Sequence, residues 1–594
     1  MNSPYQFLHL AKMKFINLIL LSLLLLNGCQ NQDVEWTSFG NDLSNQRYSK
    51  LEQINKENVD KLEMAWQAQT GVKATFQATP IVHKGIMYVS LPFNSVVALD
   101  AVNGREIWRY QHELNPNWKI CCGPSNRGVA INGNQIFFGT VDARLISLNT
   151  KTGEKIWDIS VVKNSVDSES ISDLNQSDSN SEKKISGGTG VGISMAPVVY
   201  NNKVIIGITG VGYGLHIEEE GDNTGLGAVI GVSGNYGRSG FLAAYDIHSG
   251  EKIWQFNTIA ETGWEGNFTN FIEGGLTLNR DIYKEKASLD KYPNSSRFGG
   301  GTAWTTPAID KKTNTLFFGT GNPSPQMSAE TRPGDNLYSV SIIALDTETG
   351  QLKWHYQQVP HDIWGYDVAS PPALFYAYHN GQVIPAVAQA SKTGWLYILN
   401  RDTGALILKS EAFVPQSNLF AGASKEGTVI YPGILGGSNW SPISINIDLN
   451  FAFVSGIHAP IKYTLHENNL GNESSAYTSS EPTNDPQWGL LSAINLSTGK
   501  IQWQYKTEQP LIGGTLTTKA GLVFVGEGNG NFNAFDASTG NLLWQTKGDA
   551  GVNAPPISYM INGEQYIAVV AGGNKIMGFP QGDFINVYKL PKIK

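Results

Sequence analysis

Two neighbouring thiols are the first feature of this sequence that could carry chemistry. Beyond Cys29 the chain contains only Cys121 and Cys122. In an oxidising compartment two adjacent thiols can close a small disulfide ring across a strained peptide, and the alternative is a pair of reduced, buried thiols. The sequence contains no Cys-x-x-Cys-His segment, so it encodes no covalently attached haem. We therefore predict a disulfide ring and no haem of the chain's own.

The N-terminus predicts the oxidising compartment in which such a ring can form. Two lysines precede a mostly apolar run over residues 15–26, which is too short to span a membrane and is proportioned like a secretory signal. The run ends in a Leu-Asn-Gly-Cys segment at 26–29 that resembles a bacterial lipobox. We expect a signal peptide over 1–28 and a mature protein tethered to a membrane in the periplasm through the lipidated Cys29. A buried N-terminal hydrophobic segment is the alternative.

The overall composition excludes several classes of protein. The 594 residues include 43 Lys+Arg and 51 Asp+Glu, which give a net charge of −8. This balance, without a basic run, argues against a nucleic-acid binder, and the apolar and aromatic content argues against intrinsic disorder. The chain has 64 glycines and 15 tryptophans, but only 16 % of its residues are charged. Such a composition favours many short strands joined by tight turns.

The elements that must position these residues repeat along the chain. Six times an alternating run ends in Asp or Asn, Gly follows four residues later, and Trp follows four residues after the Gly. The six tryptophans are Trp108, Trp157, Trp254, Trp354, Trp503 and Trp544. A seventh copy has Leu408 where Trp is expected, and Trp66 ends an eighth copy that lacks its first half. The sequence therefore predicts eight copies of one structural unit.

Each unit has the residues of strands joined by a tight turn. The Asp or Asn side chain can bond the turn amides, and Gly adopts the positive φ that other residues resist. A further strand pair precedes most copies, as at 85–89 and 135–138. These features predict an all-β, eight-bladed β-propeller in which each Trp docks against the neighbouring blade. A β-solenoid or several sandwiches are the alternatives, and the unit spacing of about 40–50 residues favours the propeller.

Longer segments between the units predict loop insertions. They cover 161–185, 214–239, 262–300 and 456–487. In a propeller such insertions cover one mouth of the central channel, where ligands bind. No segment has the composition of a linker between domains, so residues 29–594 are predicted to form a single domain.

A set of further segments is more specific than the repeat. They are Cys121–Cys122 with Asn126–Ala130, Met195–Pro197, Gly299–Trp304, Gly319–Pro323, Arg332–Asn336, Pro360–Trp364 and Gly437–Trp440. In this order the segments resemble the quinoprotein alcohol dehydrogenases, the methanol and ethanol dehydrogenase family that uses pyrroloquinoline quinone (PQQ). The resemblance extends from about Trp36 to Leu590, and it is specific as a set although each segment alone is weak.

The resemblance implies which residues hold the cofactor. In that family a ring of adjacent cysteines covers one face of the quinone and a Trp the other, which would be Cys121–Cys122 and Trp304. Arg127 would pair with a cofactor carboxylate, and Lys392 would lie at the reactive quinone oxygens. The other implied cofactor contacts are Ser194, Thr209, Gly210 and Asn439. Taken alone, Trp304 fits core packing and Lys392 a solvated surface charge; only their joint occurrence in family order favours the cofactor site.

The resemblance also implies a metal ion, and here the sequence departs from the family. Asn322 matches a metal-binding Asn, and a Ca²⁺ or lanthanide ion would polarise the quinone carbonyl. However, the position of the metal-ligand Glu falls on Gly212, that of the catalytic Asp on Gly365, and that of a further cofactor-side Glu on Gln77. Three carboxylates are therefore missing from the places where the resemblance implies them.

Two groups of acidic residues could replace the missing carboxylates. Asp367 lies two residues after Gly365, so in an extended segment it points to the same side. It also matches an extra carboxylate of lanthanide-using members of the family. We therefore take Asp367 as the candidate base and metal ligand, with an ordinary turn carboxylate as the alternative. The run 218–220 could fold back into the site, but a solvated acidic loop is the favoured interpretation of it.

The expected function is that of a periplasmic quinoprotein dehydrogenase. It would oxidise an alcohol with PQQ and pass the electrons to a separate cytochrome or quinone, since the chain encodes no haem site. The missing carboxylates leave two alternatives open. One is a catalytically degenerate relative that binds the quinone, or nothing. The other is a scaffold lipoprotein that resembles the propeller of outer-membrane assembly.

Overall fold

Most of the described chain is built from mainly antiparallel sheets of four or five strands. The structure, a computed structural model, describes residues 33–592 apart from 115–123, 163–183, 188–191, 210–214, 219–238, 261, 325, 328 and 471–472. The expected signal peptide, Cys29, the Cys121–Cys122 pair, Gly210 and Gly212 lie outside these residues. Within the described part, seven sheets have four strands and one has five. We number them 1 to 8 along the chain.

The first four sheets hold the N-terminal third of the chain and its C-terminus. Sheet 1 consists of β2 (Glu63–Gln69), β38 (Phe584–Lys589), β37 (Glu564–Ala571) and β36 (Ile557–Ile561). Sheet 2 consists of β3 (Ile81–His83), β4 (Ile86–Leu91), β5 (Ser95–Asp100) and β6 (Glu106–Gln111). Sheet 3 consists of β7 (Ala130–Asn132), β8 (Gln135–Gly139), β9 (Arg144–Asn149) and β10 (Lys155–Ser160). Sheet 4 consists of β12 (Val198–Tyr200), β13 (Lys203–Gly207), β15 (Phe241–Asp246) and β16 (Lys252–Asn257).

The last four sheets follow the same order of strands. Sheet 5 consists of β17 (Ala308–Asp310), β18 (Thr315–Gly319), β19 (Ser341–Asp346) and β20 (Leu352–Gln357). Sheet 6 consists of β21 (Ala373–His379), β22 (Gln382–Ala390), β23 (Leu396–Asn400) and β24 (Leu406–Lys409). Sheet 7 consists of β26 (Ser444–Asn446), β27 (Phe451–His458), β30 (Trp488–Asn495) and β31 (Ile501–Thr507). Sheet 8 consists of β32 (Thr515–Thr518), β33 (Leu522–Gly526), β34 (Asn531–Asp536) and β35 (Leu542–Lys547), with β1 (Tyr48–Ser49) parallel to β32.

The repeat tryptophans join each sheet to the next. Trp108 of sheet 2 donates its indole N–H to the carbonyl of Thr150 in sheet 3, and a Cβ on Gly153 would lie 2.5 Å from its ring. The glycine of each turn is therefore needed both for its positive φ and for the space that the indole occupies. The same indole bond is made by Trp66, Trp157, Trp254, Trp354, Trp503 and Trp544. Between sheets 6 and 7 the smaller Leu408 lies against Gly499 instead.

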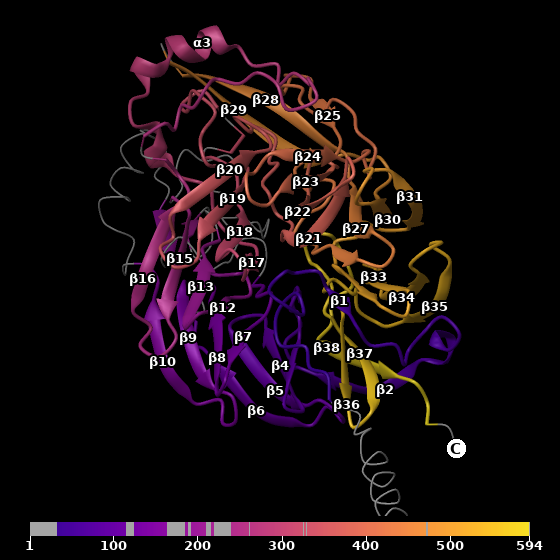
Figure 1. The fold of residues 1–594 in the computed structure, drawn as a ribbon. Coiled ribbons are helices and arrows are strands. Elements are labelled where there is room, and N and C mark those ends of the chain that lie inside the picture. Colours follow the sequence, from indigo (N-terminus) through magenta and orange to yellow (C-terminus); the bar gives the residue numbers. More distant parts are fainter. Residues whose placement is uncertain are drawn as a thin grey trace, which may run out of the picture.

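The two ends of the chain meet in sheet 1. β2 pairs with β38 in an antiparallel register that includes Trp66 opposite Val587, and Figure 1 shows the indigo β2 beside the yellow C-terminal strands. Trp544 of sheet 8 donates to the carbonyl of Leu62, directly before β2. The Trp contacts, with Leu408 in place of Trp between sheets 6 and 7, thus pass from sheet 1 through to sheet 8 and return to sheet 1.

The hydrophobic core lies between neighbouring sheets. Between sheets 2 and 3, for example, the fully buried Val96 and Ala98 of β5 share a cluster with Ile136 and Phe138 of β8. Each sheet buries apolar side chains on both faces, so the sheets support one another as a series of layers.

The N-terminal segment before β2 crosses the inner strands of several sheets. Backbone carbonyls of residues 43–47 accept hydrogen bonds from β17, β21, β26 and β32 at Ile309, Leu374, Ile445 and Thr517. Arg47 is fully buried and donates to the carbonyls of Thr515 and Pro556. The short helix η1 (Val59–Lys61) then leads into β2.

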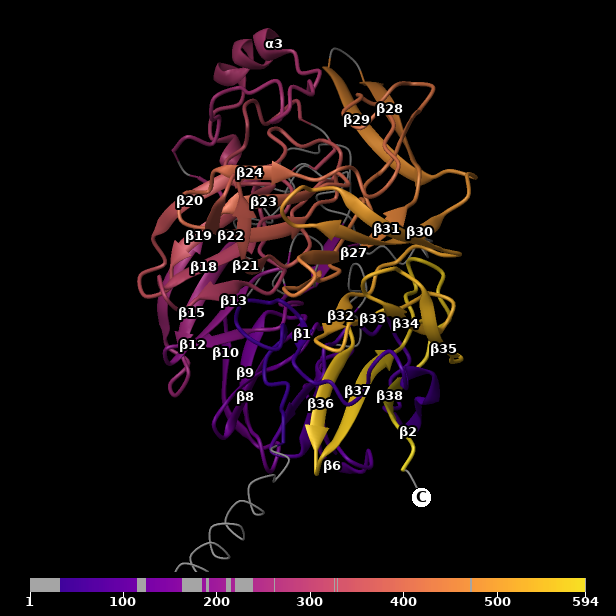
Figure 2. The same ribbon diagram turned by 45° about the vertical axis from the view of Figure 1, so that its right-hand side comes forward.

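The insertions form additional elements at one end of the molecule. The segment 262–300 contains α3 (Ile282–Ala287), η2 (Leu289–Lys291) and η3 (Ser295–Phe298). The expected excursion at 456–487 is largely a hairpin of β28 (Ile461–Leu470) and β29 (Glu473–Pro482), which pairs with β25 (Thr428–Ile430). Within the other insertions, β11 (Lys184–Gly187) pairs with β14 (Leu215–Glu218). Figures 1 and 2 both place α3 and the β28–β29 hairpin at the same end of the molecule, opposite β36. No helix in the described part of the chain is long and apolar enough to cross a membrane.

Candidate functional site

The candidate residues lie at corresponding positions of several sheets. Gln77, Ser194, Trp304 and Asn553 each lie four residues before the first residue of an innermost strand, namely β3, β12, β17 and β36. Arg127 lies three residues before β7. Because equivalent strands of the different sheets run in the same direction, side chains that precede them lie at one end of these strands.

Arg127 is the centre of the first group of contacts. Its Nη1 donates to Ser194 Oγ at 2.8 Å, and that hydroxyl lies 2.5 Å from Thr209 Oγ1. The guanidinium carbon is 4.9 Å from the centre of the Trp304 ring and 5.5 Å from that of Trp440. A buried guanidinium held over two aromatic faces remains positively charged and can pair with a ligand carboxylate.

Asp367 is the centre of the second group. The indole N–H of Trp304 donates to Asp367 Oδ2 at 3.0 Å, and Lys392 forms an ion pair with Oδ1. The ammonium of Lys392 also donates to the carbonyl of Gly365 at 3.0 Å. Asp367 and Lys392 are each 6 % exposed, so their attraction is little weakened by solvent. Trp304 joins this group to Arg127.

Asn439 and Asn322 lie beside these groups. Asn439 donates to the carbonyl of Leu435 at 2.9 Å, and its neighbour Trp440 is one of the rings near Arg127. Asn322 Nδ2 donates to Asp362 Oδ2 at 2.6 Å. Contacts thus join Arg127, Ser194, Thr209, Trp304, Asp367 and Lys392. Asn322 and Asn439 bond to other residues, and Cys121, Cys122 and Gly210 lie outside the described residues.

Asp362 is a structural carboxylate. It accepts hydrogen bonds from the backbone N–H groups of Trp364, Gly365 and Tyr366 as well as from Asn322. Burial raises the pKa of Asp362, although these hydrogen bonds favour its charged form. Its two oxygens are therefore occupied in holding the turn that carries Gly365.

The space beside Gly365 is occupied by other side chains. Gly365 has a φ of +90°, which non-glycine residues adopt only under strain. A Cβ added there would lie 2.5 Å from Ile434 Cγ1 and 2.9 Å from Gln326 Nε2. The missing aspartate therefore cannot be restored at this position without moving Ile434.

Two further residues of the site were not identified from the sequence. Trp440 lies near Arg127, and Asn553 is completely buried at the position equivalent to Trp304. A sequence signal for Asn553 does exist, because it lies three positions before a proline, as do four other residues of the site. The pairs are Gln77 and Pro80, Ser194 and Pro197, Trp304 and Pro307, Asn439 and Pro442, and Asn553 and Pro556.

Several polar atoms of the site have no hydrogen-bond partner within the described chain. They are Gln77 Oε1, Trp440 Nε1 and both amide atoms of Asn553, all of which are buried. A buried polar group without a partner costs about 1–3 kcal/mol, so a bound ligand or an ordered water would stabilise these atoms. Together with the cations Arg127 and Lys392 and the ring of Trp304, these atoms fit a planar, polar, anionic molecule such as PQQ.

The same residues do not fit a multivalent metal ion. Of the expected metal ligands, Asn322 offers an amide oxygen and Asp367 a carboxylate that is already paired with Lys392. Elsewhere in the described residues no three His, Cys, Asp or Glu side chains come together to hold a metal. Ca²⁺ usually takes six to eight oxygen ligands with several carboxylates among them, so this donor set is too small and too positive.

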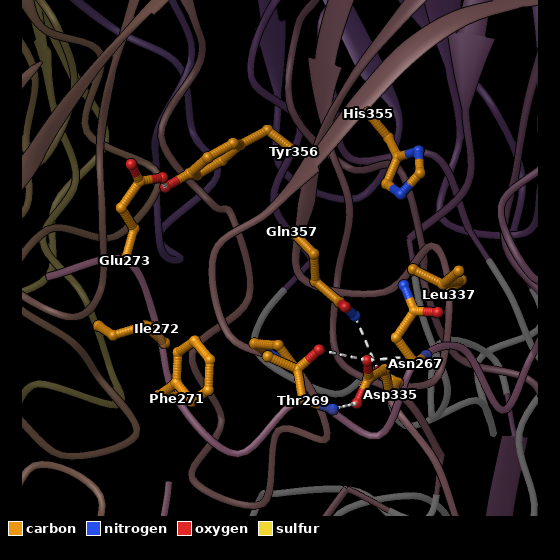
Figure 3. A pocket seen from close by; sticks show the side chains of 11 residues that line it. Asn267, Thr269, Phe271, Ile272, Glu273, Asp335, Leu337, His355, Tyr356 and Gln357 are labelled. Carbon is orange, nitrogen blue, oxygen red and sulfur yellow. Dashed lines mark hydrogen bonds between the residues drawn. The ribbon is translucent and has the colours of Figure 1, made fainter. Parts of the chain in front are cut away.

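None of the candidate residues lines the cavity of about 460 Å³ between the insertion at 267–273 and β20. Figure 3 shows two hydrogen bonds to Asp335 in this cavity. Thr269 Oγ1 donates to its carboxylate, and Gln357 Nε2 donates to its backbone carbonyl. Arg280 also pairs with the Asp335 carboxylate. These contacts attach the insertion to sheet 5, so Asp335 is occupied by the fold.

Comparison with known proteins gives one consistent match. A PQQ family model, described as the β-propeller domain of glucose, ethanol and alcohol dehydrogenases, matches residues 36–423 and 414–567. Quinoprotein alcohol dehydrogenase PedH of Pseudomonas putida is 31 % identical over 598 residues, covering 93 % of this chain and 90 % of that protein. The quinohemoprotein alcohol dehydrogenase of Comamonas testosteroni is 31 % identical over 578 residues, covering 92 % of this chain and 73 % of that protein.

Solved structures show the same similarity. The crystal structure of the Comamonas testosteroni enzyme superposes with a TM-score of 0.75 and 28 % identity, covering 94 % of this chain and 81 % of that one. A europium-containing methanol dehydrogenase superposes with a TM-score of 0.74 at 24 % identity, covering 94 % and 98 % of the two chains. At that identity the second match shows the fold alone.

Proposed function

Since this chain belongs to the family of PQQ-dependent quinoprotein alcohol dehydrogenases, we propose that it binds PQQ and oxidises an alcohol. The observation that carries the proposal is the continuous set of contacts from Arg127 through Trp304 to Asp367 and Lys392. These residues bring an aromatic face, two cations and one carboxylate to one end of the inner strands. Such a combination suits an anionic redox cofactor and a substrate that must lose a proton.

The residues of the site have separable roles in holding PQQ. Arg127 pairs with a cofactor carboxylate, and Trp304 supplies one flat face. The Cys121–Cys122 ring supplies the other face. Ser194, Thr209, Gly210 and Asn439 complete the polar contacts. When bound, PQQ supplies the acceptor for the hydride of the alcohol carbon.

Asp367 is proposed to take the proton of the substrate hydroxyl. It is the acidic residue of the described site whose carboxylate is not occupied by backbone N–H groups, in contrast to Asp362. The indole of Trp304 and the ammonium of Lys392 fix its orientation, which a general base requires. Lys392 places a positive charge beside the carboxylate.

The scaffold is proposed to be an eight-bladed propeller with one blade for each numbered sheet. The Trp contacts, together with the Leu408 contact between sheets 6 and 7, support this interpretation, because they pass once through the eight sheets and end at Leu62 beside β2. A closed ring leaves no sheet edge exposed between blades. The insertions with α3 and the β28–β29 hairpin would then cover the mouth above the site. Residues 29–594 would form this single domain.

The protein is proposed to act in the periplasm, tethered to a membrane by a lipid on Cys29. Its electrons would pass to a separate cytochrome or quinone. Radiolabelled palmitate should label the wild-type protein, and the Cys29→Ser variant should be unlabelled and released into the soluble periplasmic fraction. Labelling of the variant, or a cytoplasmic wild-type protein, would contradict this localisation.

Binding of PQQ without turnover is the second candidate function. It is favoured by Gly365, where Ile434 and Gln326 occupy the space beside the backbone. The two functions are distinguished by one pair of measurements on the purified, PQQ-loaded protein. Calorimetric titration measures PQQ binding, and reduction of a dye by a panel of primary alcohols measures turnover.

The expected result is PQQ binding together with dye reduction that is lost in Asp367→Asn. Binding with no reduction for any alcohol would leave the second candidate. An absence of PQQ binding would contradict both.

A further inference from the structure

We infer that this site takes PQQ without a metal ion, and that the ammonium of Lys392 is the cation it offers to the quinone in place of one. The inference rests on the proposed binding of PQQ, and it concerns how the charge of that cofactor is balanced. A Ca²⁺ or lanthanide ion, as expected from the family resemblance, is the alternative that the experiment below tests.

The charges of the described site already favour an anion. Arg127 and Lys392 contribute two buried cations, and Asp367 contributes one carboxylate. The carboxylate of Asp362 is bonded by backbone N–H groups and Asn322, and the fully buried Arg332 donates to its backbone carbonyl. The site is thus net positive, which complements a molecule with three carboxylate groups. A multivalent cation would add to a positive charge that only the ligand could offset.

The ion pair between Lys392 and Asp367 occupies the place where a metal would bind. A metal that used Asp367 as a ligand would lie close to the ammonium of Lys392, and the two positive charges would repel each other in a buried, weakly screened site. Two carboxylates that could offset this repulsion are lacking, because Gly212 and Gly365 have no side chains. Asn322 provides only a neutral amide oxygen beside Asp362.

Lys392 is held in a position to act as a fixed cation. An ammonium has three donors, and two of them are directed to the carbonyl of Gly365 and to Asp367. Its stem passes against Gly436, where an added Cβ would collide with it. Gly436 has a φ of +82°, so a glycine makes room for the lysine stem. The side chain is therefore ordered before any ligand arrives, with one donor left for the quinone.

The packing beside Gly365 shows that the surrounding chain fills the space that a carboxylate at this position would need. Ile434 fills the space next to Gly365, and Ile434 belongs to the same loop as Gly436. An aliphatic side chain thus lies where the family resemblance implies a carboxylate. The stem of Lys392 packs against Gly436, two residues after Ile434. The loss of metal-binding charge and the packing around Lys392 thus occur together in one loop.

The test is a titration of PQQ into protein purified with a chelator. Binding is measured by the quenching of tryptophan fluorescence. We expect the Kd for PQQ in EDTA and in Ca²⁺ or La³⁺ to agree within about twofold. Mass-spectrometric metal analysis of the loaded, desalted protein should find PQQ but well under one equivalent of metal. PQQ binding that requires a metal, or one retained equivalent of metal, would overturn the inference and leave the proposed function intact.

Two variants separate the roles of the paired charges. Lys392→Met should weaken PQQ binding about tenfold or more in every buffer, and Lys392→Arg should restore most of the affinity. Asp367→Asn should not weaken PQQ binding, even though it removes the candidate base, because the carboxylate is not needed to hold a metal. Circular dichroism and thermal unfolding check that each variant is folded.

A metal site predicts the opposite pattern. Asp367→Asn would then weaken PQQ binding in Ca²⁺ or La³⁺ buffer but not in EDTA, and this result would overturn the inference. The failure of PQQ to bind the wild-type protein in every buffer would contradict the proposed function, and the inference with it.

Discussion

The indole N–H of Trp304 donates to Asp367 Oδ2 at 3.0 Å. The residue proposed to carry one face of the cofactor therefore also holds the residue proposed to accept the substrate proton. Lys392 pairs with the other oxygen of the same carboxylate, so the base is fixed from both sides. Cofactor binding and orientation of the base depend on one side chain.

Replacement of Trp304 with Phe should separate turnover from binding. Phe keeps an aromatic face but removes the N–H that holds Asp367, and a hydrogen bond to a charged group contributes about 1.5–3 kcal/mol. We expect kcat for alcohol oxidation to fall about tenfold or more, while the Kd for PQQ changes only a few-fold. Calorimetry and steady-state kinetics provide the two values. An unchanged kcat would show that the indole does not position the base.

Replacement of Asn553 with Val should stabilise the protein and weaken its hold on the ligand. Both amide atoms of Asn553 are buried without a partner in the described chain. Removing them should raise the free energy of unfolding of the ligand-free protein by about 1–2 kcal/mol. Urea unfolding measures this change, and PQQ titration should show a weaker affinity.

Asn446 provides a matched control for that variant. It is equally buried, but its amide donates to Thr517 Oγ1 and to the carbonyl of Thr518. Asn446→Val should therefore lower the free energy of unfolding. If Asn553→Val were as destabilising as Asn446→Val, Asn553 would have a structural partner and not a ligand.

Replacement of Gly404 with Ala should show what the docked tryptophans contribute. Gly404 has a φ of +75° and an added Cβ would lie 2.7 Å from Trp354. Gly381, in the same sheet, has a φ of +78° but nothing within 4 Å of the added Cβ. Both variants incur the strain of a positive φ, about 1 kcal/mol, whereas only Gly404→Ala also displaces the indole. We expect it to lose about 1–3 kcal/mol more in urea unfolding. Equal losses would mean that the Trp contact is dispensable.

Stability should fall as the pH drops below the ordinary pKa of histidine. Burial, with the charges of Arg332 and Arg280, holds the pKa of His361 well below its usual value, and its Nδ1 donates to the carbonyl of Gly334. In the unfolded chain the same imidazole takes up a proton near pH 6.5. The unfolded state therefore binds more protons below that pH. The free energy of unfolding can consequently fall by up to about 1.4 kcal/mol for each unit by which the pH is lowered.

His361→Gln tests that assignment. The amide of Gln can keep a hydrogen bond to Gly334 but does not titrate. The free energy of unfolding of the variant should depend less steeply on pH between about 5 and 6.5 than that of the wild type. Parallel slopes in urea titrations at several pH values would assign the effect to other histidines, such as His355, whose pKa burial also lowers.

The repeating part of the fold is local in origin and could be predicted from the sequence. The spacing from Asp346 to Gly350 to Trp354 fixes a strand, a tight turn and a second strand within nine residues. The structure confirms this hairpin, as β19 and β20 pair across that turn. The direction of the indole toward Gly404 of the next sheet could also be anticipated, since each copy places the same two residues in the same places.

The candidate site could be predicted only in part. Arg127, Trp304 and Lys392 were assigned by their resemblance to a family pattern, and the structure brings these three together. Asp367 was one of two possible replacements for the missing carboxylates, and only the tertiary structure shows it between Trp304 and Lys392. The isolation of Asn553 from polar partners has no sequence signal, because it depends on what all its neighbours lack.

The sequence alone therefore determined the repeating unit, the number of its copies and the order in which the family segments occur. Hydrogen bonds within a turn and the alternation of a strand act over a few residues, so the order of residues suffices to predict them. Only the tertiary structure decided that Ile434 fills the space beside Gly365 and that Lys392 neutralises Asp367. These contacts join separate loops, and they form only when the strands that carry those loops pack together.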